Sequence, residues 1–177
     1  MYACWAVWCC WPEREKMAKH KEEKTNALRI LDQKKIPYTV HVYDGSNGAV
    51  DGVTVARTLG QDEERVYKTL VTRGASGQHY VFDIPVAETL DLKKAAKAVG
   101  EKSVAMILSR ELLPRTGYVH GGCSPVGMKK QFPTVFHEDA VLYETICVSA
   151  GKIGLQAELS PMELMALIGA ETADIIV

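Results

Sequence analysis

The segment VYKTLVTRGASGQHYVFDIP, residues 66–85, decides the fold of this chain of 177 residues. Its first run, 66–71, is mainly apolar and β-branched, and the run 79–84 is apolar and aromatic, as is typical of strands. The intervening 74–77, Gly-Ala-Ser-Gly, has the composition of a hairpin turn. Pro85 ends the second run. We therefore expect two strands joined as an antiparallel hairpin, and we expect the first strand to be buried because its run is mainly apolar.

Short helices and strands are predicted on both sides of this hairpin. Capping residues, first-turn prolines and closing glycines predict helical segments at 26–35, 53–59, 61–64, 91–97, from Ser109 onward, and 161–168. Strand-like runs are found at 38–43, 134–137, 145–149 and 155–159. Since these elements do not alternate regularly, we predict an α+β fold with a mixed, largely antiparallel, barrel-like sheet surrounded by short helices.

The composition is that of an ordinary water-soluble domain, with 47% hydrophobic and 24% charged residues. The net charge of -1 gives no overall positive field, which a free-standing RNA-binding protein would need. If the substrate is RNA, we therefore expect a partner to hold it. No apolar run approaches the roughly 20 residues that would span a bilayer, so we expect a cytoplasmic protein without a membrane segment.

The cysteines and the N-terminal segment give further limits. No pair among Cys4, Cys9, Cys10, Cys123 and Cys147 has the two-residue spacing of zinc or redox motifs. We therefore expect no metal, no disulfide framework and no cofactor.

Residues 1–16 hold all three tryptophans and precede a second methionine, Met17. We interpret 1–16 as an extension from an upstream start codon or a cloning artefact, with a membrane-surface anchor as the alternative, and 17–177 as a single domain. Neither a basic start nor a small-residue cleavage site indicates a signal peptide.

Missing motifs narrow the chemistry. There is no dinucleotide fingerprint, Walker loop, zinc-protease helix or serine-hydrolase elbow. Three candidates remain: Lys68 within its apolar run, the glycine-rich segment 121–127, and the turn 149–152. On periodicity alone, Lys68 is more readily a solvent-exposed strand lysine than a functional one.

The glycine-rich segment could direct backbone amides at a carbonyl or oxyanion, with a plain tight turn as the alternative. A thiol nucleophile at Cys123 with His120 as its base is not favoured, because their spacing on an irregular loop does not fix a contact. A buried cysteine is more often a small apolar residue.

Four segments together resemble a known family: TNALRILD at 25–32, VYKTLV at 66–71, TGYVHGGCSPVGMKK at 116–130 and VSAGKIGL at 148–155. In this order and spacing they are similar to the YbaK/EbsC family of Cys-tRNA(Pro) deacylases, which are related to the editing domain of bacterial prolyl-tRNA synthetases. The resemblance extends from residue 17 to the C-terminus.

The resemblance implies a site without metal or enzyme nucleophile, in which Lys68 is the catalytic residue. The implied substrate-binding residues are Tyr43, Thr69, Gly121, Gly122, Ser124, Pro125, Ser149 and Gly151. A pocket acid of some relatives corresponds to either Gln156 or Glu158, and the sequence leaves this open. For a cysteinyl substrate the family implies attack by the substrate's own thiol, with aminoacylated tRNA(Pro) as substrate and prolyl-tRNA synthetase as partner.

Three other interpretations stay open from the sequence. A deacylase of this kind could act on another mischarged tRNA, such as Ala-tRNA(Pro), because pocket size cannot be derived from sequence. The same pocket could serve a non-catalytic module that binds a nucleotide or an RNA 3′ end. The glycine-rich segment could also be purely structural in an α+β domain.

Overall fold

The computed structural model describes residues 24–46 and 48–177, so the predicted extension 1–16 lies outside the described residues. The α-helices are α1 (Asn26–Lys34), α2 (Gly52–Leu59), α3 (Leu92–Ala98), α4 (Ser109–Thr116) and α5 (Pro161–Ile168). Two short 3₁₀ helices are η1 (Glu63–Arg65) and η2 (Glu138–Leu142). No helix in the described ranges has the length and hydrophobicity needed to cross a bilayer.

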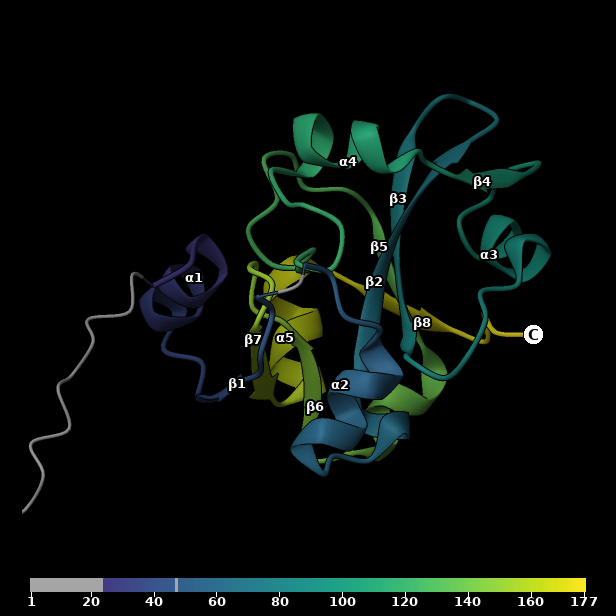
Figure 1. The fold of residues 1–177 in the computed structure, drawn as a ribbon. Helices are drawn as coiled ribbons and strands as arrows, with labels where there is room; N and C mark the ends of the chain where they lie inside the picture. Colours follow the sequence, from purple (N-terminus) through teal and green to yellow (C-terminus); the bar gives the residue numbers. More distant parts are fainter. Residues whose placement is uncertain (1–23, 47) are drawn as a thin grey trace, which may run out of the picture.

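The strands form two sheets. Strands β1 (Tyr38–Val42), β7 (Leu155–Leu159) and β6 (Ile146–Ser149) form an antiparallel sheet in that order. The second sheet has the order β4 (Val104–Met106), β2 (Tyr67–Gly74), β3 (His79–Pro85), β5 (Thr134–His137) and β8 (Glu171–Ala173). Figure 1 shows the β2–β3 hairpin between the three-stranded sheet on one side and α3 with β4 on the other.

The predicted hairpin is confirmed, but its first strand, β2, is only partly buried. Strands β2 and β3 are antiparallel, with Thr69 directly opposite Asp83 in the register. Every residue of β3 is buried, because this strand lies between β2 and β5 in the centre of the five-stranded sheet. The hairpin is therefore the scaffold from which the rest of the site is built.

Buried apolar side chains hold the two sheets and the helices together. One cluster joins Leu31 of α1 and Leu164 of α5 to Leu159 of the three-stranded sheet. A second cluster packs Phe82 of β3 against Ala95 of α3. Complete burial of side chains of this size stabilises the fold by about 1.5–3 kcal/mol each.

The α+β class and the surrounding short helices are confirmed, but the barrel-like core is corrected. The described strands form two open sheets, which meet at a single bridge between Val66 and Cys147. Strands β4 and β8 were not predicted, because each has only three residues and shows no measurable alternation. The pairings of β5 with β3 and β8 are parallel, whereas the other pairings between strands are antiparallel.

Candidate active site

A pocket of about 560 Å³ lies along the exposed edge of β2, between the two sheets. Its lining comes from separate parts of the chain: Tyr43, Asp51, Lys68, Thr69, Met106, Leu108, His120, Gly121, Cys123, Ser149 and Gln156 are among its residues. Of the residues predicted for the site, it brings together Tyr43, Lys68, Thr69, Gly121 and Ser149.

The edge of β2 gives this pocket backbone hydrogen-bonding groups. Strand β4 pairs only with Thr72–Gly74, and the N–H of Ile107 donates to the carbonyl oxygen of Val71 at 3.2 Å. Backbone groups point to alternate edges along a strand, so the N–H and C=O of Thr69 face the same edge as the Val71 carbonyl. The pocket is therefore lined by one backbone donor and one backbone acceptor of Thr69.

Lys68 is half-buried in the wall of this pocket rather than extended into solvent. Its Nζ donates a hydrogen bond to the carbonyl oxygen of Val86 at 2.9 Å. Burial lowers the pKa of Lys68, while the carboxylates of Asp51 and Glu88 act in the opposite direction. An ammonium group has three N–H donors, so the lysine can also hydrogen-bond a ligand in the pocket.

The turn after β6 holds Ser149 at the pocket. The N–H of Gly151 donates to Ser149 Oγ at 3.3 Å, so the hydroxyl proton of Ser149 can be donated elsewhere. Thr25, which caps α1, also donates from its hydroxyl to the carbonyl oxygen of Ala150 at 2.6 Å. Gly151 itself does not line the pocket; a Cβ there would lie 2.8 Å from the ring of Tyr118.

The glycine-rich segment approaches the rest of the protein very closely. Gly121 has a φ of +79°, and a Cβ at this position would lie 2.5 Å from the Cβ of Ala49. A Cβ on Gly122 would lie 3.0 Å from the backbone nitrogen of Ile153. These glycines are needed because one backbone segment packs directly on two others.

The remaining predicted loop residues shape the loop without lining the pocket. Gly122, Ser124 and Pro125 are absent from the pocket wall. Ser124 Oγ accepts a hydrogen bond from the N–H of Val126 at 3.3 Å, and Pro125 lines a second cavity beside α1. This hydrogen bond of Ser124 thus lies within the loop, and Pro125 faces the second cavity.

The two thiols of the described chain are buried. Cys123 lines the pocket, and burial, together with the nearby Asp83 carboxyl, raises its pKa to about 12. A thiol with this pKa is not ionised at neutral pH and is a poor nucleophile. This agrees with the expectation that Cys123 does not attack the substrate.

The structure distinguishes the two candidates on β7. Gln156 is buried in the pocket wall, and its Oε1 has no hydrogen-bond partner among the described residues. Glu158 lies on the same face of β7, two residues further along, and outside the pocket lining. Gln156 therefore occupies the pocket position, as an amide rather than an acid.

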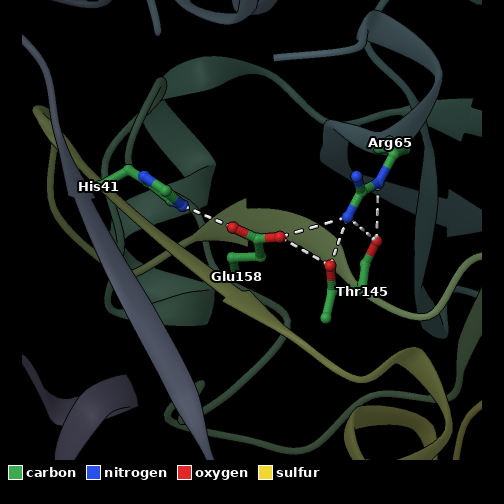
Figure 2. A network of polar contacts seen from close by, with 4 residues as sticks. All are labelled: His41, Arg65, Thr145 and Glu158. Carbon is green, nitrogen blue, oxygen red and sulfur yellow. Dashed lines mark hydrogen bonds and ion pairs between the residues drawn. The ribbon is translucent and has the colours of Figure 1, made fainter. Parts of the chain in front are cut away.

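Glu158 belongs to a polar network shown in Figure 2. Its Oε1 accepts from Thr145 Oγ1 at 2.6 Å and from Arg65 at 3.2 Å, and its Oε2 lies 2.7 Å from His41 Nε2. Arg65 also donates to the carbonyl oxygen of Thr145 at 3.0 Å. These hydrogen bonds, first that of Thr145 and then that of His41, lower the pKa of Glu158.

This network joins η1, just before β2, to both β1 and β7, and so fixes the two sheets on either side of the pocket. The Sγ of Cys147 lies within 4.8 Å of the donor atoms of His41 and Glu158. Burial raises the pKa of Cys147 to about 12, and the Arg65 guanidinium already neutralises Glu158. These residues therefore fit an ion-pair network better than a metal site.

Sequence reasoning missed Asp83, which lies behind Thr69. The Thr69 hydroxyl donates to Asp83 Oδ1 at 2.6 Å, and Asp83 is fully buried. Burial raises the pKa of Asp83 to about 7, although the hydrogen bond from Thr69 acts against this shift. The only sequence signal was an acidic residue inside an apolar strand.

The family is established by comparison with known proteins. The aminoacyl-tRNA editing domain family matches residues 47–167. The chain therefore belongs to the aminoacyl-tRNA editing domain family. This confirms the predicted family relationship and the predicted enzyme class, an aminoacyl-tRNA deacylase.

Particular relatives agree with this assignment. The chain is 46% identical over 160 residues to "Putative Cys-tRNA(Pro)/Cys-tRNA(Cys) deacylase EbsC" of Enterococcus faecalis (strain ATCC 700802 / V583), covering 90% of this chain and 98% of the relative. A solved structure described as "a putative trans-editing enzyme for prolyl tRNA synthetase" is 27% identical, with a TM-score of 0.74, and the match covers 86% and 97% of the two chains. A 22% identical "hypothetical protein" shares the fold, with a TM-score of 0.78 over 86% of this chain and all of the other.

Proposed function

We propose that this protein removes cysteine from mischarged Cys-tRNA(Pro), with Lys68 as its catalytic residue. The observation that carries the proposal is that Lys68, Thr69 and Gly121, from separate parts of the chain, line one pocket. The name of the relative from Enterococcus faecalis supports the choice of a cysteinyl substrate.

The chemistry follows from what the pocket contains. An aminoacyl ester is already activated, so catalysis needs a fixed geometry and stabilisation of the negative charge that develops on the carbonyl oxygen. Lys68 and the backbone donors would supply that stabilisation. The substrate's thiol attacks its own ester carbonyl, the C–S bond forms as the C–O bond to the terminal ribose breaks, and the thiol proton passes to the ribose oxygen. The products are a thiolactone and free tRNA.

The buried Cys123 thiol, whose pKa is raised, supports substrate-assisted chemistry rather than attack by an enzyme thiol. Tyr43, Ser149 and Gln156 line the pocket, and in this proposal they orient the aminoacyl group. Gly122, Ser124, Pro125 and Gly151 would act indirectly, by holding the loop and the turn in position.

We further propose that prolyl-tRNA synthetase or the tRNA itself provides RNA specificity, since the net charge is only -1. The isolated protein should then deacylate Cys-tRNA(Cys) as well, and addition of the synthetase should favour Cys-tRNA(Pro). A tight, salt-insensitive complex with tRNA alone would contradict this. Because its substrate is made where tRNAs are charged, we propose that the protein acts in the cytoplasm. We also propose that residues 17–177 form its single domain. Mass spectrometry of the native N-terminus tests whether the protein starts at Met17.

The decisive experiment compares hydrolysis of cysteinyl-, alanyl- and prolyl-tRNA(Pro) by the wild type and by Lys68→Ala. Lys97→Ala, the same change on the exposed surface of α3, is the matched control. We expect loss of the cysteinyl ester only, abolished by Lys68→Ala and unaffected by Lys97→Ala. Preferential loss of the alanyl ester would instead assign the alanine-specific alternative, and intact esters throughout would favour a binding module.

A further inference from the structure

Asp83 and Thr69 form a buried pair directly behind the pocket. They face each other across the β2–β3 ladder, and the Thr69 hydroxyl lies 2.6 Å from Asp83 Oδ1. Asp83 Oδ2 has no hydrogen-bond partner among the described residues. Thr69 also lines the pocket beside Lys68, so the pair connects a buried carboxyl group to the space that a substrate would fill.

The surroundings of Asp83 do not compensate its charge. Tyr67 on β2 and Cys123 on the glycine-rich loop are the titratable groups that interact with it electrostatically, and both are acids whose pKa is raised. On β5, the residue opposite Asp83 is the apolar Phe136. No cationic side chain of the described residues forms an ion pair with Asp83.

This arrangement determines what the Thr69 hydroxyl can offer to the pocket. An ionised carboxylate only accepts hydrogen bonds, so Thr69 must donate its single proton to Asp83. Toward any other group the Thr69 oxygen can then only accept a hydrogen bond, and hydrogen-bond polarisation increases its negative character. When Asp83 is protonated, this constraint is lost, because the carboxyl group can itself donate to Thr69.

We propose that Asp83 is a positioning residue that turns the Thr69 hydroxyl into an acceptor for the α-ammonium group of the aminoacyl ester. The α-ammonium is the cation on a cysteinyl group, and an uncompensated buried carboxylate behind Thr69 favours a cation in front of it. This inference rests on the proposed deacylation and adds a determinant of how the aminoacyl group is held. The Lys68 ammonium, from the neighbouring position on β2, remains free to act on the ester carbonyl.

The test compares Cys-tRNA(Pro) with N-acetyl-Cys-tRNA(Pro), which has no ammonium group. The variants are Asp83→Asn, which keeps an acceptor for Thr69 but no charge, and Thr69→Val, which removes the hydroxyl. Asp174→Asn, which removes an exposed carboxylate beside Lys94, is the control for a simple change in net charge.

We expect the wild type and Asp174→Asn to prefer the free ammonium substrate, and Asp83→Asn to lose about tenfold of that preference in kcat/KM at pH 8, as for a lost charge-assisted hydrogen bond. At pH 6 the wild type should approach Asp83→Asn, because its own carboxyl is then protonated. At each pH the substrate preference of the wild type is divided by that of Asp83→Asn. This ratio cancels the titration of the substrate's thiol and amine, which both proteins share. In a Thr69→Val background, Asp83→Asn should have no further effect on the preference.

An unchanged preference in Asp83→Asn across the pH range, with normal loss of activity in Lys68→Ala, would overturn this inference alone. If the wild type hydrolysed no ester, the proposed function would fail instead. Should Asp83→Asn not fold, Thr69→Val decides: retention of the full preference for the free ammonium substrate overturns the inference, and its loss supports it.

Discussion

Replacement of Gly121 by alanine tests how the pocket wall is built. The change places a Cβ 2.5 Å from the Cβ of Ala49 and forces alanine to adopt a φ of +79°. The left-handed conformation costs about 1–2 kcal/mol for a residue with a Cβ, and the overlap adds about 1–2 kcal/mol, because Ala49 is exposed and can partly move. We expect Gly121→Ala to lose about 2–4 kcal/mol of stability in total.

The matched control is Gly169→Ala at the end of α5. Gly169 has a similar positive φ of +66°, but a Cβ there would meet no atom within 4 Å. It should therefore show the backbone cost alone, about 1–2 kcal/mol. Urea unfolding of both variants gives the difference, and kcat/KM for Cys-tRNA(Pro) should fall about tenfold or more in Gly121→Ala only, because its backbone lines the pocket.

A second substitution separates overlap from backbone strain. Adding Ala49→Gly to Gly121→Ala removes the nearest clashing atom and should restore part of both stability and activity. If Gly121→Ala were no less stable than Gly169→Ala and fully active, the close packing of the loop on Ala49 would not be needed to form the pocket, and the reasoning would be refuted.

Three further predictions concern buried and paired groups. Glu158→Gln should lose about 1–2 kcal/mol in urea unfolding near neutral pH, because the carboxylate accepts charge-assisted hydrogen bonds; since its pKa is lowered by folding, this difference should shrink as pH falls below about 4. Cys123 and Cys147 should resist iodoacetamide at pH 8 in the folded protein, whereas rapid labelling seen by peptide mass spectrometry would contradict their burial. Asp83→Asn should be more stable than the wild type above pH 7, by about 1–3 kcal/mol in urea unfolding, with no gain below about pH 4.

Local signals allowed much of the fold to be predicted. Thr25 caps α1, at the start of the helix predicted over 26–35, and Gly60 and Gly169 close α2 and α5 in the left-handed conformation. The strands β4 and β8 escaped prediction because they are short and depend on partners far away in the sequence. Strand β5 lies between β3 and β8 through parallel pairings, which no local pattern specifies.

Most of the predicted residues that line the pocket lie in segments that resemble the family; Tyr43 is the exception. Lys68 and Ser149 belong to segments that resemble the family, and the structure brings both to one pocket. Gln156 and Glu158 share one face of β7, so the alternation of strand residues could not distinguish them in the sequence. The structure distinguishes them, because Gln156 lines the pocket and Glu158, further along the strand, does not. Asp83 became visible only through its cross-strand register and its burial.

The stability cost of Asp83 is itself an argument for its role. Unfolded, its carboxyl group titrates near pH 4, whereas burial raises its pKa to about 7 in the folded protein. Between these values the unfolded chain has released a proton that the folded chain retains, so stability falls as pH rises from about 4 to 7 and stays reduced above. An apolar residue at the centre of β3 would avoid this loss and fill the same strand position. Because the carboxyl's one hydrogen bond goes to a residue of the pocket wall, its compensating benefit is best sought in substrate binding.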